Sequence, residues 1–229
     1  MNAEWRAFLE QAGAIWTPDQ IASFGQPEQE LQQALTEDIC CDVSHQGLIA
    51  VRGPDGETFL QGQLTCDVRR VTAGQSLLGA YCTPKGRALA CGRVFLHEQS
   101  YYLELPQSLV EPTLTRLRKY VMRAKTELAD ASDAMAQIGI AGPQTARLLE
   151  ERGLVTDQAM AANAVQQTRH LTIIRLPGPV PRFELHGPAL ELAQVWQALS
   201  PDVAPVGTDA WRLLDVLAGT PVVYPETVE

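Results

Sequence analysis

The stretch Ile49-Ala50-Val51-Arg52-Gly53-Pro54 returns 89 residues later as Ile138-Gly139-Ile140-Ala141-Gly142-Pro143. In each copy, a short apolar run typical of a strand meets a Gly-Pro corner, and apolar residues at helical spacing follow. A third copy of this order begins at Phe183-Glu184-Leu185-His186-Gly187-Pro188. Gly-Pro is a common turn pair, so chance is the alternative explanation, but the shared offset of the first two copies favours an internal duplication.

The residues around these corners predict two rounds of strand, helix, strands and helix. Between the first two copies, the apolar stripe of Val110, Leu114, Leu117 and Val121 indicates a helix over 107–122. This order predicts an α+β fold in which duplicated split-βαβ-like units form mainly antiparallel sheets. An N-terminal amphipathic helix with Trp5, Phe8, Leu9 and Ala12 on one face is expected to end at Gly13. The other predicted elements are helices over 27–35 and 209–217 and strands over 77–82, 88–96, 101–105, 168–176 and 182–186.

The same pattern predicts the domain organisation. We expect an N-terminal helical lead-in over 1–46, of which 36–46 is irregular, and then a first α+β subdomain over 47–134. A second α+β subdomain follows over 135–224, and the acidic residues 225–229 form a tail. A length of 229 residues suits two small domains or one large one.

Composition excludes several classes of protein. The chain carries a net charge of −9 with 45% hydrophobic residues, which is a globular balance without a basic bulk charge. We therefore expect no direct binding of nucleic acid, although a local basic pocket for a small anionic ligand remains compatible with this charge. The nearest approach to a basic cluster is formed by Arg116, Arg118, Lys119, Arg123 and Lys125.

Cysteine usage and hydropathy indicate a cytoplasmic protein. The five cysteines include no C-x-x-C pair, so we expect reduced, semi-buried thiols and no metal site. The first residues lack the pattern of a signal peptide, and no apolar run reaches the length of a membrane span, so we expect no membrane partner. The common catalytic and nucleotide-binding motifs are also missing, so we predict no catalytic residue.

Two segments of the first predicted subdomain carry more polar groups than a scaffold needs. Gln63 and Asp67 follow a predicted helix, where a binding role competes with a helix end and an Asx-type turn. Tyr81 precedes a turn that carries Lys85 and Arg87, and these two cations suit a carboxylate or a phosphate. A solvated turn is the alternative for this second segment.

A third segment suits recognition of a heterocycle. Glu184 and Phe183 lie on opposite faces of a predicted strand. A carboxylate can accept two hydrogen bonds from the 2-amino-4-oxo-pyrimidine ring of a pterin, and Trp211 can stack on such a ring. The alternative for Trp211 is core packing of an amphipathic helix together with Leu214 and Leu217.

These three segments, in this order, resemble those of the YgfZ family of folate-binding proteins, which are relatives of the glycine-cleavage T-protein, an aminomethyltransferase. The resemblance covers roughly residues 47–224, and its motifs are specific when taken together. It is carried by the run Leu60-Gln61-Gly62-Gln63-Leu64-Thr65-Cys66-Asp67-Val68, the turn Tyr81-Cys82-Thr83-Pro84-Lys85-Gly86-Arg87, the helix end Leu117-Arg118-Lys119-Tyr120-Val121-Met122-Arg123-Ala124-Lys125, the strand Ile138-Gly139-Ile140-Ala141-Gly142 and the helix Trp211-Arg212-Leu213-Leu214-Asp215-Val216-Leu217-Ala218-Gly219.

The resemblance implies that tetrahydrofolate, or a one-carbon derivative of it, binds in a central cavity between the subdomains. It places Trp211 where family members contact folate, and it makes Glu184 a pterin partner by analogy with the T-proteins. A second tryptophan that some members carry corresponds to a position near Gln46 and is missing here. The predicted cofactor-binding residues are Trp211, Glu184, Tyr81, Lys85, Arg87, Gln63 and Asp67.

Two departures from the family pattern bear on activity. T-proteins carry a catalytic aspartate just after their Lys-Gly turn, where this chain has Ala88-Leu89-Ala90-Cys91. YgfZ proteins also carry a later Lys-Gly-Cys-x-Thr-Gly-Gln-Glu signature and a small β-barrel, and this sequence ends at Glu229 before either. We therefore expect an accessory folate binder that supports iron–sulfur cluster assembly or repair and, indirectly, tRNA modification, with iron–sulfur proteins as partners. The alternatives are a folate-dependent aminomethyl or methyl transferase and an interaction scaffold with a vestigial cavity.

Overall fold

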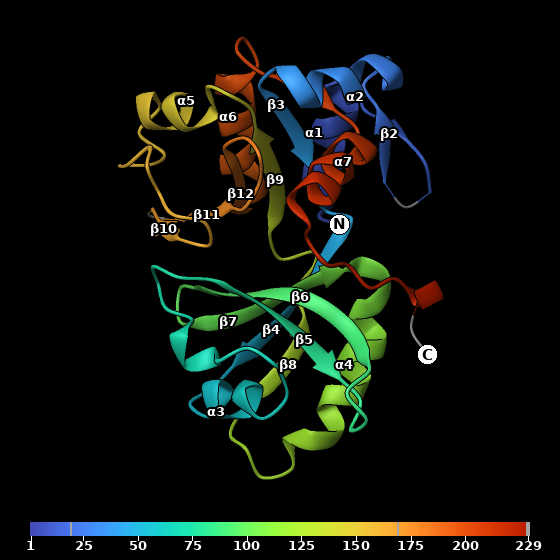
Figure 1. Ribbon diagram of the computed structural model, residues 1–229, viewed down its shortest axis with the longest axis vertical. Coiled ribbons are helices and arrows are strands. Elements are labelled where there is room, and N and C mark those ends of the chain that lie inside the picture. Colours follow the sequence, from blue (N-terminus) through green and yellow to red (C-terminus); the bar gives the residue numbers. More distant parts are fainter. Residues whose placement is uncertain (19, 169, 228–229) are drawn as a thin grey trace. The chain divides into compact units, whose positions relative to one another are not determined.

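The computed structural model describes residues 1–18, 20–168 and 170–227, which form two compact units (Figure 1). Unit 1 comprises residues 1–45 and 133–220, and unit 2 comprises residues 46–132 with the chain from Pro221 onward. Each unit has a sheet and an apolar core of its own. The last two residues of the expected acidic tail lie outside the described residues.

Unit 2 is built on a five-stranded sheet in which all neighbouring strands are antiparallel. A tight turn at Gly86, where φ is +80°, joins its first two strands. The strands, in their order across the sheet, are β5 (Leu77–Cys82), β6 (Ala88–His97), β7 (Ser100–Pro106), β4 (Gln46–Arg52) and β8 (Glu127–Asp130). Helices α3 (Gly56–Gln61) and α4 (Gln107–Val121) and the 3-10 turn η1 (Val68–Arg70) complete the unit.

One face of this sheet packs against helices α3 and α4. The predicted helical stripe is confirmed, because Val110, Leu114 and Leu117 of α4 are buried in the core together with Ile49 and Val51 of β4. Burial of apolar side chains of this kind contributes about 1.5–3 kcal/mol for each large residue. The core therefore holds one side of α4 against the sheet, and the opposite side of the helix is exposed.

Unit 1 contains a six-stranded sheet that is antiparallel except for one pair at its edge. In order across the sheet, its strands are β10 (Val165–Gln167), β11 (Thr172–Leu176), β12 (Arg182–Gly187), β9 (Ala136–Ala141), β3 (Ile39–Asp42) and β13 (Ala204–Val206). A separate two-stranded hairpin consists of β1 (Ile15–Trp16) and β2 (Ile21–Ser23). The expected α+β fold with mainly antiparallel sheets is thus confirmed.

The two faces of the unit 1 sheet differ in chemistry. One face carries an apolar core with α1 (Ala3–Gln11), α5 (Thr145–Glu151) and α6 (Ala189–Leu199). The other face is covered by α7 (Thr208–Ala218), against which α2 (Pro27–Thr36) packs. The face beneath α7 is where the polar residues of the central strands gather.

The two units share one order of elements. Strand, helix, three strands, helix and strand follow one another from β4 to β8 and again from β9 to β13. The strand order across the sheets is also the same, except that β3 lies between β9 and β13. Both first strands end in the predicted Gly-Pro corner, with φ of +106° at Gly53 and +148° at Gly142. A Cβ atom at either glycine would come within about 2.5 Å of backbone atoms, so only glycine fits there.

Two predicted elements were wrong. The segment 36–46 is not irregular throughout, because β3 lies within it and is buried on both faces, which removes the alternation that reveals a strand. The strand expected over 168–176 is shorter, because β11 begins only at Thr172, and a strand that was not predicted, β10, precedes it and pairs with it. Position 169, which belongs to the expected strand, lies outside the described residues.

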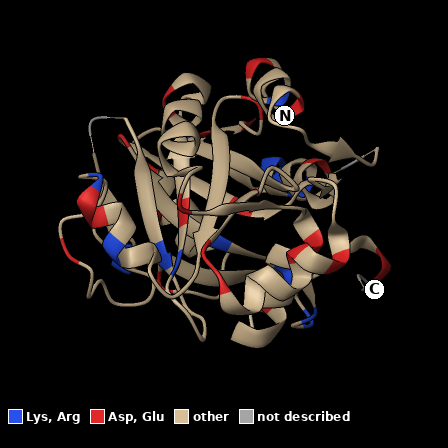
Figure 2. Cartoon of the chain, turned by 90° about the horizontal axis from the view of Figure 1, so that it is seen from above, with Lys and Arg blue, Asp and Glu red and all other residues tan. Residues whose placement is uncertain are grey.

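The helices carry charged residues along their exposed sides. Figure 2 shows both signs of charge spaced along the helical ribbons. Several of these charges form helical ion pairs one turn apart, such as Arg6 with Glu10 and Arg147 with Glu151. Across the described residues, no helix is both long enough and apolar enough to pass through a bilayer.

Candidate functional site

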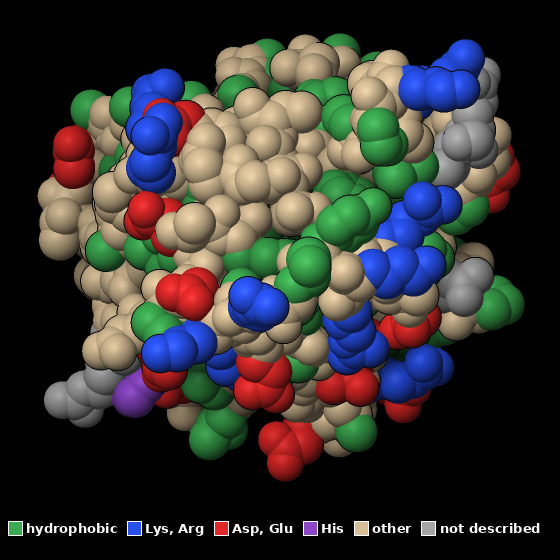
Figure 3. Space-filling view, turned by 90° about the horizontal axis from the view of Figure 1, so that it is seen from below, with side chains coloured by type: hydrophobic (Ala, Val, Ile, Leu, Met, Phe, Trp, Pro, Cys, Tyr) green, Lys and Arg blue, Asp and Glu red, His purple; other side chains and the backbone are tan. Residues whose placement is uncertain are grey.

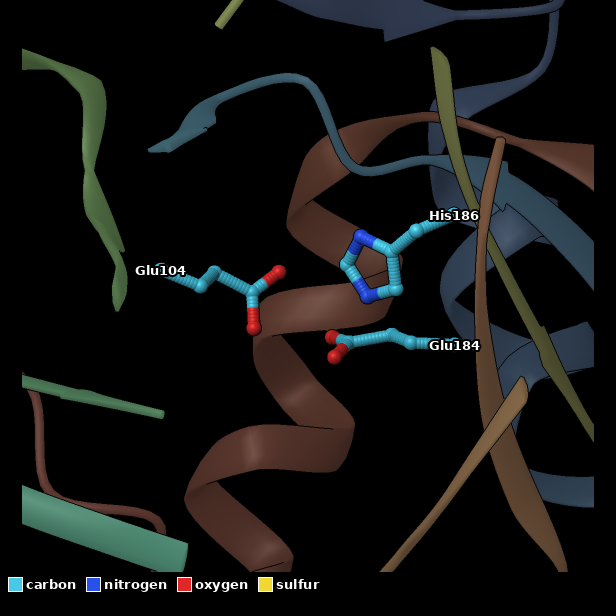
Figure 4. A group of neighbouring side chains, drawn as sticks. All are labelled: Glu104, Glu184 and His186. Carbon is cyan, nitrogen blue, oxygen red and sulfur yellow. The ribbon is translucent and has the colours of Figure 1, made fainter. Parts of the chain in front are cut away.

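The central strand β12 presents a row of polar side chains on one face of the unit 1 sheet. Arg182, Glu184 and His186 alternate with Phe183 and Leu185, and the two apolar residues lie in the core on the opposite face. All three polar residues are buried, with exposed fractions of 0%, 6% and 0%. Figure 4 shows Glu184 and His186 projecting from this strand, and Glu104, also labelled there, belongs to β7 of unit 2. A buried polar row of this kind requires specific partners, because burial of an unpaired polar group is costly.

The indole of Trp211 lies directly over Gly139 of β9. A Cβ atom built at Gly139 would come within 2.5–2.7 Å of three carbons of the six-membered ring, so only glycine permits this approach. Gly139 pairs with Glu184 across the β9–β12 ladder, and paired residues of neighbouring strands share a face. The structure therefore brings Trp211 and Glu184, two of the predicted site residues, next to each other.

Arg182 fixes helix α7, and with it Trp211, to the sheet. Its guanidinium carbon lies 4.5 Å from the centre of the Trp211 ring, a cation–π geometry. The Nη2 atom donates to Oδ1 of Asp215 at 2.7 Å, and Nη1 donates to the carbonyl oxygen of Leu214 at 3.0 Å. Three contacts from one buried side chain thus hold a full turn of α7 in register with β12.

The burial of Trp211 bears on the alternative of simple core packing. Trp211 and Leu214 are each 1% exposed, whereas Leu217 is 51% exposed. The indole therefore packs against the sheet. Leu214, one turn further on, is buried as the core-packing alternative expects, whereas Leu217, nearly two turns further on, is not. Besides its apolar packing, this indole contacts Gly139 and the guanidinium of Arg182, and Glu184 pairs with Gly139 on the neighbouring strand.

Three further predicted residues lie close together in unit 2. Leu64 forms an isolated antiparallel β-bridge with Tyr81, and the backbone N–H of Thr65 donates to the carbonyl oxygen of Ala80. The segment that begins at Gln63 therefore runs beside β5. Tyr81 is 6% exposed, and burial raises the pKa of its phenol. Asp67 is bound locally, because it accepts from Arg69 at 2.7 Å and this hydrogen bond lowers the pKa of its carboxyl.

The remaining two predicted residues, Lys85 and Arg87, lie at the turn between β5 and β6. Both are exposed. The turn is closed by hydrogen bonds from the Thr83 N–H to the Arg87 carbonyl oxygen and from the Gly86 N–H to the Thr83 carbonyl oxygen. The predicted turn between the two strands is therefore confirmed, and Lys85 and Arg87 lie on it.

Several residues that shape these sites were not predicted from the sequence. Gln61, rather than Gln63, closes the turn after α3, since its side-chain oxygen accepts from the N–H of Val68 at 2.7 Å. Gly139, Arg182 and Asp215 position Trp211. The alternation of polar and apolar residues along β12 was the available signal for Arg182, whereas contacts between distant segments leave no local pattern.

Two titratable groups near the end of β3 have strongly shifted pKa values. Asp42 accepts from Nε1 of Trp5 at 2.8 Å and from the Ser44 hydroxyl at 2.7 Å, yet burial raises its pKa from 3.8 to about 6. Burial, followed by the charge of Arg212, lowers the pKa of His45 to about 3. His45 is therefore a neutral imidazole at physiological pH.

Comparison with known proteins places the chain in a family. Residues 1–227 match the model of the GCVT N-terminal domain, and the chain belongs to that family. The glycine cleavage system aminomethyltransferase T from Bartonella henselae has the same fold, with a TM-score of 0.81 and 21% sequence identity over 97% of this chain and 63% of that one.

The chain is also a distant homologue of proteins named tRNA-modifying protein YgfZ. It is 32% identical to that of Klebsiella pneumoniae (strain 342) over 77% of this chain and 53% of the relative. It is 25% identical to that of Colwellia psychrerythraea (strain 34H) over 93% of this chain and 62% of the relative. The chain thus spans between about half and three-fifths of the length of these curated relatives.

Proposed function

We propose that this chain binds tetrahydrofolate, or a one-carbon derivative of it, through Trp211 and Glu184. The observation that carries this proposal is the position of Glu184, a buried carboxylate on the same face of the sheet as the adjacent indole of Trp211. A pterin offers an N–H and an exocyclic amino group side by side, which fit the two oxygens of one carboxylate. The indole supplies an apolar aromatic wall, which excludes water and strengthens those hydrogen bonds.

Five residues of unit 2 are further proposed contacts. Lys85 and Arg87 provide positive charges for the carboxylates of a glutamate tail, since charge-assisted hydrogen bonds are the stronger ones. Tyr81, Gln63 and Asp67 are proposed to contact the same ligand. We also propose that the shared order of elements in the two units reflects duplication of a split-βαβ unit.

Binding without group transfer is the activity that the residues favour. Strand β6 begins Ala88-Leu89-Ala90-Cys91 and contains no carboxylate where the family's transferases have a catalytic aspartate. A general acid or an electrostatic anchor near a reacting nitrogen would need such a group. Aminomethyl or methyl transfer is therefore the second candidate, and its test is analysis of products after incubation with tetrahydrofolate and a methylamine donor.

We infer the cellular role from the relatives. Homologues named for tRNA modification match this chain over most of its length, so we propose that it supports iron–sulfur cluster assembly or repair in the cytoplasm and, through enzymes that need such clusters, tRNA modification. Loss of the gene should lower the activity of cluster-dependent enzymes under oxidative stress. Unchanged activity would favour a scaffold with a vestigial cavity.

Folate binding can be tested by tryptophan fluorescence. Titration of the chain with tetrahydrofolate should give saturable quenching that is lost in Trp211→Phe. Trp196→Phe is the matched control, because Trp196 is also buried in unit 1 but packs in the aromatic cluster on the opposite face of the sheet. Quenching that persists in Trp211→Phe and fades in Trp196→Phe would place the ligand elsewhere.

A further inference from the structure

A group of unpaired cations lies on the exposed side of helix α4 in unit 2. Arg116 and Lys119 are one turn apart, and Arg123 follows just after the helix end. All three side chains are exposed, and none has an ion-pair or hydrogen-bond partner among the described residues. Figure 3 shows Lys and Arg side chains close together on the right of the face seen from below. Other exposed arginines, such as Arg6 and Arg147, are paired with acidic residues one turn away.

Two large side chains accompany these cations. Tyr120 is 53% exposed and lies four residues after Arg116, so the two side chains share one side of α4. Met122 is 87% exposed. An exposed aromatic ring among unpaired cations is the combination that single-stranded nucleic acid uses, because phosphates pair with the cations while a base stacks on the ring.

The backbone at the end of α4 is strained. Met122 has φ of +44° and ψ of −103°, a conformation that residues other than glycine adopt at a cost on the order of 1–3 kcal/mol. No apolar contact repays this cost, because the side chain projects into water. Strained backbone often occurs at functional sites, so a strained residue without packing contacts is consistent with a surface that binds a partner.

We propose that Arg116, Lys119, Tyr120, Met122 and Arg123, hereafter the α4 surface, bind a single-stranded segment of RNA. The net charge of −9 led to the opposite expectation, but the local field over a few ångströms, rather than the total charge, decides such a contact. A duplex is disfavoured because its stacked bases leave no face for Tyr120, whereas an unpaired base can be splayed onto the ring. The phenolic hydroxyl of Tyr120 can also bond the 2′-hydroxyl that distinguishes RNA from DNA. This inference does not depend on folate binding.

The test is fluorescence anisotropy of a labelled single-stranded RNA of about 12 nucleotides, titrated with the chain at several salt concentrations. Each phosphate contact contributes about 0.7 to the slope of log K against log salt concentration. Arg116→Gln/Lys119→Gln should therefore reduce the slope by about 1.4. The control Arg6→Gln/Arg147→Gln removes the same charge from helices of unit 1 and should leave the slope unchanged.

Tyr120 variants separate stacking from charge. Tyr120→Ala should weaken binding on the order of tenfold without changing the salt slope, because the ring makes no ionic contact. Tyr120→Phe should retain the stacking and lose the preference for RNA over DNA of the same sequence. The changed side chains are exposed, so circular dichroism should show all of these variants to be folded.

Three results would overturn the proposal. The first is absence of binding at low salt, and the second is an equal loss of slope in the control pair. The third is RNA binding that is unchanged in Tyr120→Ala and is inhibited by poly-L-glutamate as effectively as by unlabelled RNA. That result would assign the surface to an acidic protein.

Discussion

Removal of the carboxylate of Asp215 tests how firmly α7 and its tryptophan are tied to the sheet. Asp215 pairs with Arg182 at 2.7 Å, and the exposed fractions of the two side chains are 16% and 0%. In Asp215→Ala, the guanidinium remains buried without its counter-charge, which costs about 3–5 kcal/mol. The free energy of unfolding should fall by about that amount.

The opposite change should cost less. In Arg182→Met, the new side chain can still pack beneath Trp211, and the partly exposed Asp215 carboxylate can be hydrated, so we expect a loss of about 2 kcal/mol. The double variant Arg182→Met/Asp215→Ala should be more stable than Asp215→Ala alone, because it leaves no buried charge.

The assay is urea unfolding followed by far-ultraviolet circular dichroism. A loss of 3–5 kcal/mol corresponds to a fall in the midpoint on the order of 1–2 M. Glu151→Ala is the control, since it removes the carboxylate from a surface pair with Arg147 whose side chains are both about half exposed. That change should cost less than about 1 kcal/mol. Equal effects of Asp215→Ala and Glu151→Ala, or a larger loss in Arg182→Met than in Asp215→Ala, would refute the proposed role of the buried pair.

Three other predictions follow from the structure. Gly139→Ala places a methyl group within 2.5 Å of the Trp211 ring and should cost about 1–3 kcal/mol in urea unfolding, whereas Gly56→Ala, with 3.5 Å of clearance, should not destabilise the chain. Burial raises the pKa of Asp42 from 3.8 to about 6 in the folded chain. The free energy of unfolding of the wild type, relative to Asp42→Asn, should therefore fall by up to about 3 kcal/mol as pH rises from about 4 to about 6, and then level off. If the two proteins showed the same dependence of stability on pH, the burial argument would be contradicted. Glu184→Gln should weaken tetrahydrofolate binding by about 10- to 100-fold in calorimetry with the fold intact, because a hydrogen bond to a charged group is lost; unchanged affinity would remove Glu184 from the site.

Local patterns in the sequence predicted much of the fold. The Gly-Pro corners, the β5–β6 turn and the stripe of α4 were predicted correctly because each depends on neighbouring residues. Strand β3 was missed because it is buried on both faces and only four residues long. Its position in the sheet depends on pairing with β9 and β13, which lie far away in the sequence.

The site residues were predicted one at a time, and their arrangement was not. The sequence singled out Trp211 and Glu184 separately, while their proximity comes from the close approach of α7 to Gly139. Arg182 stands two residues before Glu184 on the same strand face, but its bond to Asp215 joins segments that no local pattern connects. Such contacts are set by tertiary packing, which spacing in the sequence does not encode.

The most direct test of folate binding is a crystal structure of the chain grown with tetrahydrofolate. We predict that the pterin ring lies against Trp211, with its amino group and ring N–H within about 3.2 Å of the carboxylate oxygens of Glu184. A pterin bound away from both residues, or a structure in which Trp211 and Glu184 contact only protein at saturating folate, would contradict the proposed site.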